Sequence, residues 1–259
     1  MDLNDLEKKH GSSKFKSGKN FLSGFIIVFT IAVTSAFILW GVSLFNEENN
    51  GKLPDDITDV SDKSSLPNPL PPLDGIRIEK VTEKDWVRGN RNAKISVIEF
   101  SDTECQFCKR FHPTMMRVVK EYKGEVNWVY RHFPLVGPHP KAPKEAEAVE
   151  CAGELAGNDG FWAYLDRIFE ITPSNNGLDL NLLPEIAEYV GLNREDFVRC
   201  LESGKYAEKV EDQVRQAVAA GGNGTPYSVI LTRDGKTIPI SGALPFAQIK
   251  ATIDPLLKK

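Results

Sequence analysis

The apolar residues of the chain change period several times, and the clearest change lies between 95 and 133. Ile95 to Phe100 is a run of strand-forming residues, which predicts a buried strand. From about Gln106 to Tyr122 the apolar residues follow helical spacing, and Val126 to Phe133 alternates as a strand does. This order predicts a β–α–β unit with two parallel strands and a right-handed crossover.

Helical spacing then continues through an insertion at about 139–220, and strands return only after it. Ile78 and Val81 are expected to form a short first strand. The predicted order is β–α–β, a helical block, then β–β–α, which is an α/β sandwich with a helical cap. The late strands are Tyr227–Leu231 and Thr237–Ile240, and the helices are Lys144–Ala156, Gly160–Ile171, Asn181–Val190, Arg194–Leu201, Tyr206–Ala220 and Pro245–Leu257.

Glycines punctuate the helical block, with Gly157 and Gly191 expected to end or break helices. In its last helix, Val210, Val214 and Val218 stack on one side, which is therefore expected to be the apolar face.

An uncharged apolar stretch of 25 residues, Phe21–Phe45, precedes the folded part and is long enough to cross a bilayer. Five lysines lie between 8 and 19, and Glu47 and Glu48 follow the stretch, which predicts a cytoplasmic N-terminus. A cleaved signal peptide is the alternative, but apolar residues continue beyond the small residues Thr34-Ser35-Ala36, which favours an uncleaved anchor. The expected divisions are a tail at 1–20, a transmembrane anchor at 21–45, a flexible linker at 46–75 and a folded domain at 76–259.

Charge adds little to this picture, because the formal net charge is −4 for the whole chain. Residues 76–259 hold 25 basic and 26 acidic side chains, so no basic face for nucleic acid is expected. The four cysteines permit two disulfides if the domain is exported to an oxidising compartment.

Two of the cysteines, Cys105 and Cys108, form a CxxC motif at the start of the predicted helix. A cysteine there lies beside unpaired backbone N–H groups and the positive end of the helix dipole, which stabilise a thiolate. A stabilised thiolate is a well-populated nucleophile and a good leaving group. The motif therefore predicts a thiol–disulfide oxidoreductase that needs no cofactor.

Three other interpretations of the motif are weaker. A zinc site needs about four ligands, but Cys151 and Cys200 are isolated, and His112 and His132 lie in segments predicted as helix and strand. Haem attachment requires a histidine after the second cysteine, where Lys109 stands. A purely structural CxxC disulfide closes too short a loop to constrain the unfolded chain much.

Several further motifs accompany the CxxC along residues 76–259. They are Glu99 six residues before Cys105, Arg131-His132-Phe133-Pro134-Leu135, Gly160-Phe161-Trp162, Phe197-Val198-Arg199-Cys200-Leu201 and Gly224-Thr225-Pro226. Together they make the sequence resemble the membrane-anchored members of the DsbA-like branch of the thioredoxin superfamily. The resemblance implies a thioredoxin-like fold with the helical block as its inserted domain.

The resemblance also implies the roles of individual residues. Cys105 would be the reactive thiol, Cys108 its buried resolving partner, and Glu99 a buried acid that exchanges protons with Cys108. A solvent-facing Glu99 is the alternative, because the facing of its strand is open. Thr225, the cis-proline Pro226 and the dipeptide Gln106-Phe107 would contact the substrate, and an ordinary loop is the alternative for Gly224-Thr225-Pro226.

The remaining two cysteines, Cys151 and Cys200, are expected to form a structural disulfide, as the related family often does. Two buried free thiols are the alternative.

The expected activity is disulfide formation in exported proteins that bear cysteines, with a membrane redox partner that re-oxidises the CxxC. A reductase, an isomerase or a non-catalytic binding module are the alternatives. Gln106-Phe107 lacks the histidine of the strongest oxidants of the family, which leaves the redox potential open.

Overall fold

The computed structural model describes residues 76–258. The expected tail, the anchor Phe21–Phe45 and the linker lie outside this range. Among the helices within 76–258, none combines the length and apolar character that a membrane crossing requires.

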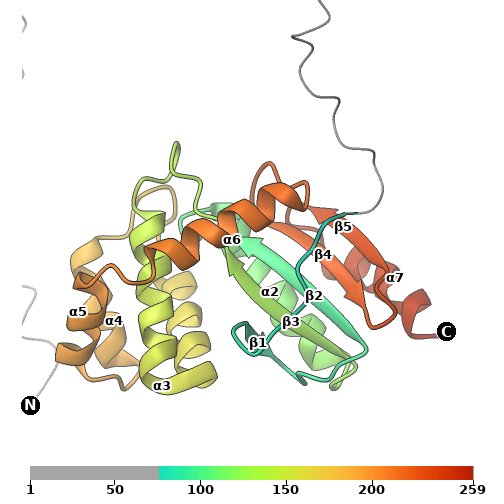
Figure 1. Cartoon of the computed structure of the whole chain (residues 1–259), viewed down its shortest axis with the longest axis horizontal. Coiled ribbons are helices and arrows are strands. Elements are labelled where there is room, and N and C mark those ends of the chain that lie inside the picture. Colours follow the sequence, from blue (N-terminus) through green and yellow to red (C-terminus); the bar gives the residue numbers. More distant parts are fainter. Residues whose placement is uncertain (1–75, 259) are drawn as a thin grey trace, which may run out of the picture. The chain divides into compact units, whose positions relative to one another are not determined.

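A mixed five-stranded sheet forms the centre of the domain, in the spatial order β1-β3-β2-β4-β5 (Figure 1). The strand predicted at 95–100 is β2, Ile95–Ser101, and lies in the middle of the sheet. It pairs parallel with β3 and antiparallel with β4, so the predicted β–α–β unit is confirmed. The other strands are β1 (Trp86–Arg88), β3 (Val126–His132), β4 (Tyr227–Thr232) and β5 (Thr237–Ser241).

Alternate residues of β2 enter two different cores, because side chains of a strand point to opposite faces. Ile95 and Val97 pack in the larger core, with helices α2 (Gln106–Glu121) and α7 (Phe246–Leu257). Ile98 and Phe100 pack in the smaller core, with α6 (Ala207–Ala219). Glu99 has the parity of Ile95 and Val97, so the strand directs its carboxyl group towards α2.

Along the chain, the inserted helices follow β3 and precede β4, as predicted (Figure 1). The first of them, α3 (Ala142–Ile171), bends at Ala156 and Gly157, where the backbone leaves helical geometry. Gly157 has a φ of 66°, which glycine adopts without the strain of a Cβ atom. The other inserted elements are the 3₁₀ turn η1 (Leu180–Leu182), α4 (Leu183–Tyr189), α5 (Arg194–Glu202) and α6.

Two sequence-based expectations are wrong. Ile78 and Val81 form no strand: the edge of β3 is occupied instead by β1, whose Trp86 pairs with Tyr130. Both residues pack against the smaller core and belong to no strand.

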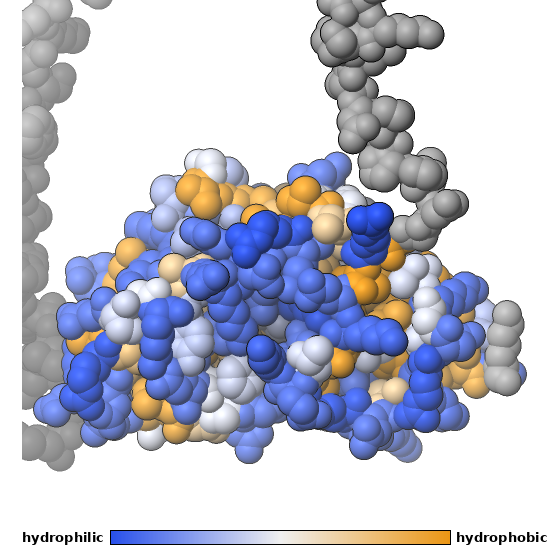
Figure 2. All heavy atoms as spheres, in the orientation of Figure 1, coloured by the Kyte–Doolittle hydropathy of each residue, from blue (hydrophilic) through white to orange (hydrophobic). Residues whose placement is uncertain are grey.

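The apolar face of α6 agrees with the expected one at Val210 and Val214, which pack against the core, but not at Val218. Val218 is 61% exposed, whereas Val210, Gln213 and Ala217 are buried. The Gln213 side-chain oxygen accepts a hydrogen bond from the His132 backbone N–H at 2.6 Å, which satisfies a polar group inside the core. Elsewhere the surface is mainly hydrophilic on the face shown in Figure 2, with hydrophobic residues in small groups between the polar ones.

Candidate active site

Cys105 occupies the N-cap position of α2, and Gln106 begins the helix. The Cys105 backbone N–H donates to the Asp102 carbonyl oxygen at 3.1 Å. The Cys105 carbonyl oxygen accepts from the Lys109 backbone N–H at 3.0 Å. The residue is 5% exposed, so Cys105 is buried except for a small part that reaches solvent. This position places the thiol where the first N–H groups of the helix have no partner within the helix.

The pKa of Cys105 is lowered from 9.0 to about 5. Hydrogen bonding by the Cys108 thiol lowers it most, and the Thr225 side chain and the backbone N–H groups of Cys108 and Phe107 lower it further, while burial opposes the shift. Each of these donors stabilises the thiolate and not the thiol. Cys105 is therefore ionised at neutral pH.

Cys108 has the opposite properties. It is fully buried one turn along α2, and the Asp102 backbone N–H donates to its sulfur at 3.5 Å. Burial, then the neighbouring Cys105 and Glu99, raise its pKa well above the usual value. One helix turn thus holds a thiolate that is 5% exposed and a protonated thiol that has no exposure.

Glu99 lies beneath the two cysteines, on the central strand, and is 1% exposed. Burial raises its pKa from 4.5 to about 7, against the lowering effect of Ser101 and Trp128. The Glu99 charge also raises the pKa of Cys108, so the two groups interact. A carboxyl group with a pKa near neutrality is suited to give and take protons.

Thr225 and Pro226 immediately precede β4 and are joined by a cis peptide bond. The Cys105 thiol lies 3.5 Å from the Thr225 carbonyl oxygen, although 120 residues separate them. The antiparallel pairing of β2 with β4 brings the two segments to the same end of the sheet. In the dipeptide between the cysteines, Gln106 is exposed and Phe107 is 44% exposed. The structure therefore gathers the predicted catalytic and substrate-binding residues around Cys105.

Two polar pairs next to the motif have no clear signal in the sequence. Asp102 is 2% exposed, and its carboxylate contacts the His139 imidazole at 2.8 Å. Glu104 is fully buried beside Glu145, and burial followed by Glu104 raises the pKa of Glu145 to about 9. The sequence predicts for Asp102 only a role at the helix start, and a single histidine in a loop has no periodicity that points to a site.

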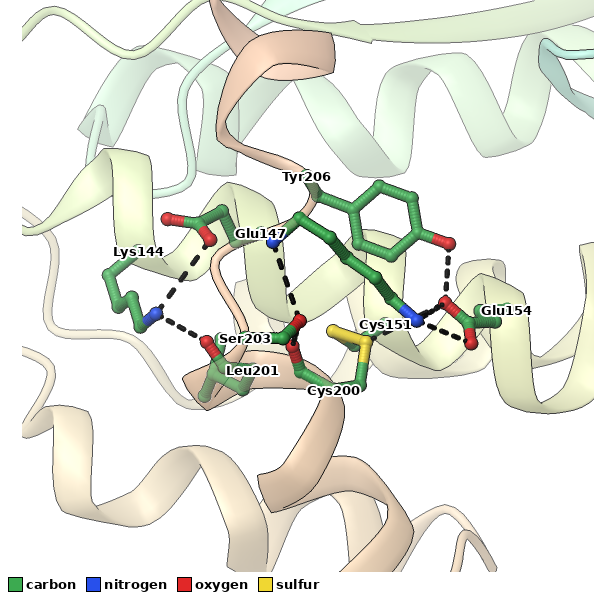
Figure 3. The surroundings of a disulfide bond; sticks show 9 residues. Lys144, Glu147, Cys151, Glu154, Cys200, Leu201, Ser203 and Tyr206 are labelled. Atoms are coloured by element: carbon green, nitrogen blue, oxygen red, sulfur yellow. Dashed lines mark hydrogen bonds and ion pairs between the residues drawn. A yellow bond between two sulfur atoms is a disulfide. The ribbon is translucent and has the colours of Figure 1, made fainter.

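Cys151 and Cys200 are joined in a disulfide between α3 and α5, with Cα atoms 5.8 Å apart (Figure 3). Beside it, Glu154 accepts hydrogen bonds from Lys205 and from the Tyr206 hydroxyl. The bridge ties two inserted helices together and is separate from the groups that contact Cys105. Within residues 76–258, no cluster of three or more His, Cys, Asp or Glu side chains is arranged to hold a metal ion.

Comparison with known proteins matches residues 81–254 to the family model Thioredoxin_4, described as thioredoxin. Among solved structures, DsbA2 of Pseudomonas aeruginosa is 28% identical, with a TM-score of 0.60 over 70% of this chain and 98% of that one. Oxidised BdbD of Bacillus subtilis is 23% identical, with a TM-score of 0.58 over 68% and 94% of the two chains, and shares the fold.

A curated relative, the Na⁺/H⁺ antiporter NhaA 3 of Salinispora tropica, is 31% identical over 148 residues, which are 56% of this chain. The matched residues make up only 21% of the length of that antiporter.

Proposed function

The chain belongs to the thioredoxin family, as a DsbA-like oxidoreductase, and we propose that it forms disulfide bonds in exported proteins. The observation that carries this proposal is the asymmetry of the CxxC motif. Cys105 has a pKa of about 5 at the start of α2, while Cys108 is buried and protonated. A stabilised Cys105 thiolate favours the reduced protein, and hence makes the disulfide form a better oxidant.

The reaction begins with the Cys105–Cys108 disulfide. A client thiolate attacks the Cys105 sulfur, a client–Cys105 bond forms, and the Cys105–Cys108 bond breaks. Cys108 leaves and takes a proton, which Glu99 is placed to donate from the core. A second client thiolate then attacks the client sulfur, which releases the Cys105 thiolate. The client loses two electrons, and the protein gains them as a dithiol.

The client would bind beside Cys105, along the exposed Gln106-Phe107 dipeptide and the Thr225–Pro226 segment. Thr225 lies in the loop before β4, and backbone groups of such a loop are suited to pair with an extended peptide.

The proposal places the domain outside the cytoplasm, anchored by Phe21–Phe45. The uncharged length of that stretch and the lysines before it support this topology. The Cys151–Cys200 disulfide also fits an oxidising compartment. Repeated turnover would need a membrane partner that accepts two electrons from the Cys105–Cys108 dithiol.

Equilibration of the full-length chain with glutathione buffers tests the direction of electron flow. The Cys105 pKa of about 5 lies between about 7 for thioredoxin and about 3.5 for DsbA. We therefore expect a potential above about −250 mV and below about −120 mV, between the values of about −270 mV for thioredoxin and about −120 mV for DsbA. A potential below about −250 mV would reject the oxidase and favour a reductase.

A further inference from the structure

The Asp102 carboxylate is the centre of a hydrogen-bond network directly before the CxxC helix. One of its oxygens accepts from the Leu135 backbone N–H and contacts His139 Nδ1, both at 2.8 Å. The other accepts from the Glu104 backbone N–H at 2.8 Å. The Asp102 backbone meanwhile contacts both cysteines, through its carbonyl to the Cys105 N–H and its N–H to the Cys108 sulfur. Asp102 thus fixes His139 to the same backbone segment that positions the reactive thiols.

His139 lies in the loop between β3 and α3 and is 7% exposed. Burial lowers the pKa of His139, but hydrogen bonding and the charge of Asp102 outweigh burial, and the result is a raised pKa. The Cys105 thiolate and the Asn175 side chain raise it further. The geometry agrees with this effect, because the imidazole contacts Asp102 at 2.8 Å and the Asp102 carbonyl oxygen accepts from the Cys105 N–H at 3.1 Å.

The dipeptide Gln106-Phe107 provides no positive charge to Cys105. We propose that His139, held by Asp102, is a positioning residue that places a positive charge beside the Cys105 thiolate, from a loop outside the CxxC motif. This inference rests on the proposed function only in taking Cys105 as the reactive thiol. A cation near Cys105 stabilises the thiolate, and hence the reduced form, so His139 increases the oxidising power of the protein.

Other charged groups near His139 do not remove this effect. The Glu104 and Leu135 backbone N–H groups stabilise the Asp102 carboxylate, and His139 supplies the positive charge that balances it. Without His139, the Asp102 charge would act on the thiolate unbalanced. Glu145 has a pKa of about 9 and stays protonated at neutral pH, so it carries no negative charge there. Lys141, at the start of α3, donates to the Asn176 and Leu178 carbonyl oxygens.

The charge on His139 is present below its folded-state pKa and is lost as the pH rises through that value. The contribution of His139 to the oxidising power should therefore be full between the Cys105 pKa of about 5 and the His139 pKa. It should disappear at higher pH, where the imidazole is neutral, and at lower pH, where Cys105 is protonated. Because coupling between two sites is reciprocal, the thiolate must raise the His139 pKa as much as the imidazolium lowers the Cys105 pKa.

The experiment measures both sides of this coupling in the full-length chain. NMR titration of the His139 ring in the wild type should give a pKa higher by about one unit in the reduced than in the oxidised protein. In His139→Gln, absorbance of the thiolate should show the Cys105 pKa raised by about one unit, and the glutathione equilibrium shifted about tenfold towards the disulfide.

The matched control is His112→Gln, because His112 also contacts a carboxylate, that of Asp166, at 2.7 Å and is buried. It should leave the Cys105 pKa unchanged. Equal His139 pKa values in the two redox states of the wild type would overturn the proposal, even if the variant did not fold. The Cys105 titration detects the coupling without any client, so its result is independent of whether the chain acts as an oxidase.

Discussion

Replacing Cys105 by alanine is expected to abolish thiol–disulfide exchange, with a loss of about 10³-fold or more in the rate of client oxidation. Cys108 has no exposure and a raised pKa, so it cannot replace Cys105 as the reactive thiolate. The measurement is the rate at which the oxidised wild type and the Cys105→Ala variant convert a dithiol peptide to its disulfide.

The control is Met116→Ala, a change at a 44% exposed position of the same helix, which should retain the wild-type rate. Exchange retained by Cys105→Ala would contradict the assignment of the nucleophile. If the wild type itself shows no exchange, the chain is a binding module on a thioredoxin scaffold.

The second large effect is expected on stability. Cys151 and Cys200 are 49 residues apart in the sequence, so their bridge closes a long loop in the unfolded chain. Changing both to alanine should lower the free energy of unfolding by about 2–4 kcal/mol, because the unfolded state regains the entropy of that loop.

Urea unfolding of the double variant and the wild type gives this difference directly. Client oxidation by the double variant at low temperature provides the control, since the bridge is separate from Cys105 and exchange should persist. An unchanged free energy of unfolding would show that the bridge does not stabilise the inserted helices.

The elements of this fold that could be predicted are those with strong local patterns. The run Ile95–Phe100 and the alternation of Val126–Phe133 identified the two parallel strands, because buried strands leave a short-range signal. The prediction that Val218 lies on the buried face is wrong, because α6 packs with Gln213 and Ala217 against the core. A glutamine carries no hydrophobic signal, and its burial depends on the His132 backbone N–H that it satisfies.

The candidate site divides in the same way. The CxxC motif is local, so its chemistry follows from its place before a helix. The contact between Cys105 and Thr225 depends on the pairing of β2 with β4, which no short-range pattern determines, and only the family resemblance pointed to it. The Asp102–His139 pair joins a helix start to a distant loop, so no local pattern in the sequence predicts it.

The most direct test of the central claim is to identify the cysteine that carries a trapped partner. In a Cys108→Ala variant the resolving thiol is absent, so a mixed disulfide should accumulate when the full-length chain meets oxidised glutathione. Peptide mass spectrometry is predicted to find glutathione on Cys105, at close to one per chain. A variant that forms no adduct, or carries it on a cysteine other than Cys105, would contradict the account.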